Sequence, residues 1–266
     1  MTTTPLNHLT IGSNTKEVST VISLGSPETK YTTPEQMQLK AKPPSLLITG
    51  DLVFNKELIV NDKGVKHSSE TNTTKDNKVT YFGVTKDNDV LVKNIFHLKE
   101  SDNNKLFGIN YDKKKLMYTI FSECALFPLY CLLQDVFYFS LVNKTYCLKL
   151  GKIDVKFTPI NFNATKNAIE IVVVLDTKEI KLLFEDSQMP IKIGRKNCGI
   201  NIEHQSISKQ HGLIAYSQSV KSFYYNDTQS RNGTFITLQK GDSLPIQGEM
   251  FFILGESYFK VYELKR

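Results

Sequence analysis

The sequence lacks the features that would place it in or across a membrane. Among its 266 residues there is no apolar run of about 18, the length that a transmembrane helix needs. The first ten residues, M-T-T-T-P-L-N-H-L-T, contain neither the basic region nor the apolar region of a secretory signal peptide. We therefore expect a protein that is not secreted and works inside the cell, in the nucleus or the cytoplasm, including cytoskeletal assemblies.

The sequence is also poor in motifs that carry metals or cofactors. Its four cysteines form no C-x-x-C pair and have no neighbouring histidine at metal-ligand spacing: Cys124, Cys131, Cys147 and Cys198. In a reducing compartment they are expected to be buried thiols. No P-loop, H-E-x-x-H motif or kinase signature occurs. We expect no metal and no cofactor.

Charge gives little support for nucleic-acid binding. The net charge is +6, which permits a weak general attraction to nucleic acids. The lysines are scattered along the chain, however, and form no basic stripe. Nucleic acid is therefore not expected to be the partner.

The chain divides by composition into a tail and a β-rich region. Residues 1–44 are rich in Thr, Ser, Pro and Gln, have few aromatic residues, and end in Lys-Pro-Pro. This composition predicts a disordered tail. From Leu46 onward, short runs of β-branched and aromatic residues alternate with Asn, Asp, Gly and Lys turns. This pattern predicts an all-β fold, a sandwich or a barrel.

The β-rich region contains a weak internal repeat. Residues 107–123 align with residues 211–227, and the flanking segments also correspond. Such self-similarity predicts two copies of one fold. We expect two antiparallel β-sandwiches in tandem, at 45–157 and 168–266.

Three short motifs in the second copy supply groups that suit a phosphate. Gly194 lets the chain turn at a strand end, and the guanidinium of Arg195 can bind phosphate through two parallel hydrogen bonds. A second loop carries the Ser208 hydroxyl and the Lys209 ammonium. A third loop runs from Ser230 through Arg231, Asn232 and Gly233 to Thr234, and the Asn232 amide can pair with an extended peptide backbone.

These motifs, I-x-I-G-R, S-x-x-H and S-x-N-G-T-F, resemble those of the forkhead-associated (FHA) domain family, over about residues 168–266. The resemblance implies an FHA-type β-sandwich that binds phosphothreonine peptides and catalyses nothing. It implies phosphopeptide contacts at five residues: Arg195, Ser208, Lys209, Arg231 and Asn232. It also implies a supporting role for five others: Gly194, His211, Ser230, Gly233 and Thr234. Arg231 stands where the family often has threonine, so its contact with the ligand is open.

The first copy departs from this pattern wherever phosphate would bind. Val84 follows Gly83 where Arg195 follows Gly194, and no S-x-x-H or Asn-Gly-Thr loop follows. We interpret residues 45–157 as a degenerate FHA-like domain that serves packing or protein binding.

Two other functions remain open at this point. Ser208, His211 and Asp227 are the residue types of a hydrolytic triad, although the G-x-S-x-G elbow is missing. The degenerate first copy also fits a structural scaffold subunit of a large assembly, with no phosphate recognition.

The tail suggests a partner within the protein itself. Thr33 precedes Pro34, and Thr32 has Glu35 three residues further on, a position that FHA domains often read. Phosphorylation at Thr32 or Thr33 would let the tail occupy the site of its own chain or of a second copy.

Overall fold

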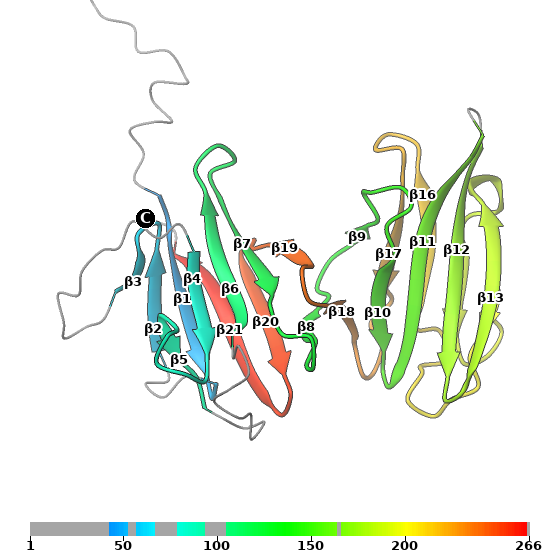
Figure 1. Cartoon of the computed structure of the whole chain (residues 1–266). Coiled ribbons are helices and arrows are strands. Elements are labelled where there is room, and N and C mark those ends of the chain that lie inside the picture. The colour runs from blue at the N-terminus through cyan, green and yellow to red at the C-terminus, as the bar shows by residue number, and fades with distance from the viewer. Residues whose placement is uncertain (1–42, 53–56, 67–78, 94–104, 164–165, 265–266) are drawn as a thin grey trace, which may run out of the picture. The chain divides into compact units, whose positions relative to one another are not determined.

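The computed structural model describes residues 43–52, 57–66, 79–93, 105–163 and 166–264 (Figure 1). The predicted tail, with Thr32 and Thr33, lies outside the described residues except for its last two positions. Within them the regular structure is β strand, apart from one 3-10 turn, η1 (Asp186–Gln188). The prediction of an all-β fold is confirmed.

The strands fall into two sets that correspond to the two sequence repeats. The first repeat contains β1 (Ser45–Gly50), β2 (Glu57–Asn61), β3 (Gly64–Lys66), β4 (Val79–Gly83), β5 (Val90–Leu91), β6 (Lys105–Asp112), β7 (Met117–Ser122), β8 (Leu129–Leu132), β9 (Phe137–Tyr138), β10 (Tyr146–Leu150) and β11 (Ile153–Asn163). The second contains β12 (Lys166–Leu175), β13 (Lys178–Glu185), β14 (Ile191–Gly194), β15 (Ile200–Asn201), β16 (Gly212–Ser217), β17 (Ser222–Asp227), β18 (Thr234–Leu238), β19 (Ser243–Pro245), β20 (Glu249–Leu254) and β21 (Ser257–Leu264).

The sheets show that the two repeats have the same topology. Two five-stranded sheets have equivalent orders, β15-β14-β16-β17-β9 and β5-β4-β6-β7-β19. In each, a strand that ends in glycine, Gly83 or Gly194, pairs in parallel with a two-residue strand. The eleven-stranded sheet has the order β13-β12-β11-β10-β18-β8-β20-β21-β1-β2-β3, so equivalent strands stand on either side of the β18–β8 pair. The expectation of two copies of one fold agrees with this order.

However, the last three strands of each repeat pair with strands of the other repeat. Strands β9, β10 and β11 pair with β17, β18 and β12 of the second repeat. Strands β19, β20 and β21 pair with β7, β8 and β1 of the first. Two sandwiches result: an inner sandwich formed by β9–β18, and an outer sandwich formed by β1–β8 with β19–β21.

This exchange corrects the expected domain ranges. The gap between 157 and 168 falls inside the β11–β12 hairpin, whose pairing runs from Asp154↔Val174 to Asn163↔Lys166. Because that hairpin is continuous, no boundary between compact units lies there. The ranges 45–157 and 168–266 mark the sequence repeats and not the sandwiches.

Aromatic side chains fill the space between the two sheets of each sandwich. In the outer sandwich, the rings of Phe107 on β6 and Phe259 on β21 stack with centroids 5.1 Å apart. In the inner sandwich, Phe157 on β11 lies 5.9 Å from Tyr225 on β17. In both pairs one ring comes from the first repeat and the other from the second. The apolar cores therefore stabilise the exchanged arrangement.

The cysteine expectation holds in part. All four thiols are free, and Cys131 is buried, which raises its pKa to about 12. Cys124, Cys147 and Cys198 are only half-buried, because they lie in loops or on partly covered strands. In the described part of the chain, no helix has the length and apolar character needed to cross a bilayer.

The exchange predicts which fragment of the chain folds alone. Residues 137–238 contain every strand of the inner sandwich, whereas residues 168–266 lack β9–β11 and carry three strands of the outer sandwich. We expect the 137–238 fragment to be a monomer with dispersed amide NMR signals and a cooperative urea transition, and the 168–266 fragment to show neither. A well-dispersed monomeric 168–266 fragment beside an unfolded 137–238 fragment would contradict the exchange.

Candidate functional site

The three predicted loops meet at one end of the inner sandwich. The pairs Ile193↔Gly212 and Gly212↔Asp227 align the end of β14, the start of β16 and the end of β17. The loops that leave these points are β14–β15, β15–β16 and β17–β18. Antiparallel pairing thus brings residues up to 39 positions apart in sequence, Arg195 and Thr234, to one edge.

Gly194 is required by the close approach of a neighbouring loop. A Cβ on this residue would overlap the backbone carbonyl oxygen of Lys209. Next to it, the Arg195 amide donates to the Ser208 carbonyl at 2.9 Å, and the Lys196 amide donates to the Lys209 carbonyl at 3.3 Å. A tight turn was the reason expected from the sequence for this glycine. The structure shows instead that the adjoining backbone of Lys209 leaves no room for a side chain.

The Arg195 side chain has one hydrogen-bond donor that stays unsatisfied within the described residues. It is half-buried, and its Nε is buried with no hydrogen-bond partner among the described residues. A buried donor without an acceptor is costly, so this guanidinium is suited to an anion that supplies the missing acceptor.

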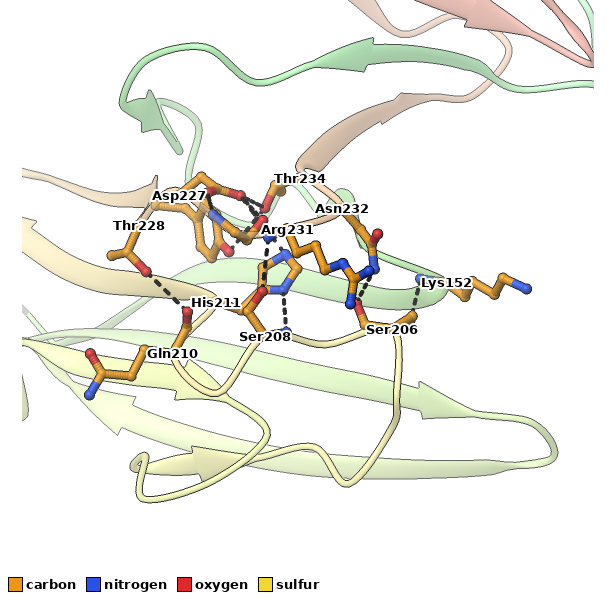
Figure 2. Close-up of polar contacts among 12 residues, drawn as sticks. Lys152, Ser206, Ser208, Gln210, His211, Asp227, Thr228, Arg231, Asn232 and Thr234 are labelled. Atoms are coloured by element: carbon orange, nitrogen blue, oxygen red, sulfur yellow. Dashed lines mark hydrogen bonds and ion pairs between the residues drawn. The ribbon is translucent and has the colours of Figure 1, made fainter.

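Ser208 and His211 form a braced turn. His211 is fully buried, and its Nδ1 accepts the Ser208 backbone N–H at 3.2 Å. The Ser208 hydroxyl oxygen accepts the Arg231 backbone N–H at 2.9 Å, which leaves the hydroxyl proton free to donate elsewhere (Figure 2). The loop that carries the serine is therefore fixed from both sides.

Burial lowers the pKa of His211, and the nearby Asp227 carboxylate and Gly233 backbone only partly oppose this effect. The Asp227 Oδ2 lies 3.8 Å from His211 Nε2. Because Nδ1 accepts a hydrogen bond, the neutral ring carries its proton on Nε2.

Asp227 organises the β17–β18 loop, a role that the motifs did not reveal. Its carboxylate accepts the Ser230 backbone N–H at 2.7 Å, the Ser230 hydroxyl at 2.7 Å and the Thr234 hydroxyl at 2.6 Å. The buried Tyr225 hydroxyl lies 3.2 Å from the Thr234 hydroxyl. An aspartate three residues before a serine at a strand end is a signal of such a side-chain turn.

Asn232 ties the β17–β18 loop to the β15–β16 loop. Its Nδ2 donates to the Ser206 carbonyl at 2.8 Å (Figure 2). Ser206 is buried, and its hydroxyl lies 2.7 Å from His204 Nδ1. The Asn232 side chain is exposed, so its Oδ1 and second N–H remain available. Ser206 was not predicted, because a serine two positions before the motif carries no signal of its own.

A turn from the first repeat completes this end of the sandwich. The β10–β11 turn lies here because Leu150 pairs with Thr234. The Lys152 backbone N–H donates to the Ser206 hydroxyl at 3.0 Å, and the Gly151 N–H donates to the Gly233 carbonyl at 3.4 Å. The site is thus built from both repeats.

Positive charge dominates the site. Lys196, Lys209, Arg231 and Lys152 are exposed, and Arg195 is half-buried. The Asp227 carboxylate at this end of the sandwich already accepts three hydrogen bonds, and Glu203 on the β15–β16 loop is exposed. The loops and the β10–β11 turn therefore present five cations against one exposed carboxylate, together with the Ser208 hydroxyl and the Asn232 amide.

The outer sandwich lacks these groups at its equivalent positions. Val84 follows Gly83 and packs against the core. The β20–β21 turn has Glu256 where the β10–β11 turn has Lys152. The loop at 94–104 lies outside the described residues.

Taken together, the fold and the loops define a β-sandwich module with a cluster of cationic loops at one end. Residues 191–248 match the family model of the FHA domain. The C-terminal part of the chain is therefore similar to the FHA domain, a family of protein-interaction modules that bind phosphopeptides. Comparisons with curated proteins and with solved structures gave no match.

The buried histidine predicts a pH-dependent stability. The folded state holds neutral His211, whereas the unfolded chain binds a proton near pH 6.5. Stability should therefore be fully present above about pH 6.5 and should decrease as the pH falls toward 5. In urea titrations between pH 5 and 8, we expect this decrease to be smaller in the His211→Asn variant.

Equal slopes in wild type and His211→Asn would contradict the prediction. If His211→Asn does not fold, the NMR titration of His211 in the wild type decides instead, and a pKa at or above the ordinary value would be the contrary result.

Proposed function

We propose that this protein is a non-catalytic adaptor whose inner sandwich captures a protein that carries phosphothreonine. One observation carries the proposal: the unpartnered Arg195 Nε lies on the loop that is hydrogen-bonded to the backbone of Ser208. The adjacent Ser208 hydroxyl has a proton to donate. A guanidinium and a hydroxyl on two loops joined by backbone hydrogen bonds suit a dianionic phosphate.

Each candidate contact has a distinct physical role. Arg195 would bind two phosphate oxygens through its planar fork. Ser208 would donate its hydroxyl to the phosphate, while its oxygen keeps the Arg231 N–H. Lys209 would add a second charge, and Arg231, at the rim, would approach the phosphate or an acidic ligand residue. The Asn232 Oδ1 and free N–H would hold the peptide backbone.

The geometry supports the non-catalytic part of the proposal. In a hydrolytic triad the histidine takes the proton from the serine hydroxyl. Here His211 Nδ1 accepts the Ser208 backbone N–H, and Nε2 faces Asp227. The Ser208 hydroxyl is bonded to Arg231 instead. Among the residues that the structure describes, no base is hydrogen-bonded to this hydroxyl.

The alternative is a structural subunit in which the FHA fold only packs against other proteins. The outer sandwich favours a packing role for that half, since Val84 and Glu256 replace the cations of the site. For the inner sandwich, this alternative predicts that phosphate on a peptide has no effect on binding.

The test is a fluorescence titration of the full chain with a threonine peptide library in phosphorylated and plain forms. We expect binding that requires the phosphate. Arg195→Ala should weaken it by about 2–5 kcal/mol, roughly 30-fold to several thousand-fold in Kd, because a charge pair shielded from water is lost. Equal binding of both peptide forms by the wild type would contradict the proposal.

Lys221→Asn provides the matched control. Lys221 lies in the β16–β17 turn, at the opposite end of the two strands that lead into the site, and has a left-handed φ of 53° that asparagine tolerates. This variant removes one positive charge without touching the loops. It should bind the phosphorylated peptide as tightly as the wild type does. An equal loss of affinity in Lys221→Asn and Arg195→Ala would mean that Arg195 acts only through its contribution to the net charge.

A further inference from the structure

We infer that Lys152, contributed by the first repeat, determines specificity at this site by selecting an acidic side chain beside the phosphothreonine. The inference rests on the proposed function and extends it to the sequence around the phosphate. It concerns a residue outside the three loop motifs and outside the 191–248 family match.

The backbone that carries Lys152 is fixed against the site. Leu150 and Ile153 pair across the β10–β11 turn, so only Gly151 and Lys152 form it. Gly151 has a left-handed φ of 56°, and a Cβ there would overlap the Ser206 carbonyl oxygen. The Lys152 N–H donates to the buried Ser206 hydroxyl at 3.0 Å. The turn backbone is thus held in contact with Ser206, and the Lys152 side chain starts from a defined position.

The Lys152 backbone lies next to the position expected for the peptide. Asn232, the candidate for holding the peptide backbone, donates to the same Ser206 whose hydroxyl accepts from Lys152. Figure 2 shows the Lys152 side chain starting beside Ser206 and extending outward, away from Ser208 and the other labelled residues. Lys152 is therefore placed for a residue that flanks the phosphothreonine rather than for the phosphate.

The charge of Lys152 is not neutralised within the described part of the chain. On the strands that flank the turn, Lys149 pairs with Asp154 at 3.1 Å and Lys156 pairs with Glu179 at 3.0 Å. Lys152 is exposed and has no ion-pair partner among the described residues. An acidic ligand residue would supply one.

The equivalent turn of the outer sandwich, between β20 and β21, differs in charge only at the position that corresponds to Lys152. Gly255 has a φ of 60°, close to that of Gly151, and Leu254 pairs with Ser257 as Leu150 pairs with Ile153. The second turn residue is Glu256. The same backbone therefore carries a cation where the phosphate-binding groups are present and an anion where Val84 replaces the arginine. Glu256 therefore provides a matched control position within the same chain.

The experiment measures the Kd of full-length protein for phosphothreonine peptides in which each flanking position carries Glu, Ala or Lys in turn. For the wild type, we expect Glu at one flanking position to bind about two- to fivefold tighter than Ala, the size of an exposed ion pair. Lys152→Ala should bind the Glu and Ala peptides equally. Lys152→Glu should prefer Lys at that position, and Glu256→Lys should keep the wild-type preference.

Two outcomes would overturn the inference: a Glu preference that persists in Lys152→Ala, or a wild type with no Glu preference at any position. These differ from failure of the proposed function, in which phosphorylated and plain peptides bind the wild type alike. Because Lys152 is exposed, the variants should unfold at the wild-type Tm, which separates a lost contact from a misfolded turn.

Discussion

The exchange of three strands between the repeats is the constraint on which the rest of the structure depends. It places β18 between β10 of the first repeat and β8 of the outer sandwich, so that one continuous sheet joins both halves. It also sets the register Leu150↔Thr234, which brings the Gly151 turn against the loops of the candidate site. Without the exchanged strands, β12 and β18 would each lose a partner, and Tyr225 would lose its contact with the Phe157 ring.

A consequence is that the candidate site does not belong to one repeat. Arg195, Ser208 and Asn232 come from the second, but Ser206, which bonds Asn232, is held by Lys152 from the first. The two copies also differ in charge at equivalent backbone positions, Arg195 against Val84 and Lys152 against Glu256. The inner sandwich thus carries the candidate anion-binding groups, whereas the outer sandwich continues the sheet from β18 through its strand β8.

Much of the fold could be predicted from the sequence because strand patterns and turn residues are local. The β-rich composition from Leu46 onward, the repeat, and the three loops between 194 and 234 are all visible as short motifs. The exchange was not predictable in this way, since a repeat strand satisfies the same hydrophobic pattern in either sandwich. The expected boundary near 157–168 was wrong for that reason.

The roles of individual site residues were likewise predictable only where they depend on local sequence. The motifs predicted phosphate contacts for Arg195 and Ser208 from their residue types and spacing, and these contacts stay predictions. The contributions of Ser206 and Gly151 depend on tertiary contacts, which no spacing reveals, whereas the Asp227 turn has a local sequence signal that the motifs did not include. Gly194 was found for the wrong reason, since the constraint comes from the Lys209 carbonyl.

The central claim, a phosphopeptide site built by both repeats, is tested most directly by amide NMR of the full chain during titration with a phosphothreonine peptide. The account predicts shifts for Gly151 and Lys152 together with the loops of residues 195–211 and 228–234, and a new hydrogen-bonded signal from Arg195 Nε–H. Residues 83–91 and 255–256 of the outer sandwich should not respond. Shifts confined to the outer sandwich, or no shift that depends on the phosphate, would contradict it.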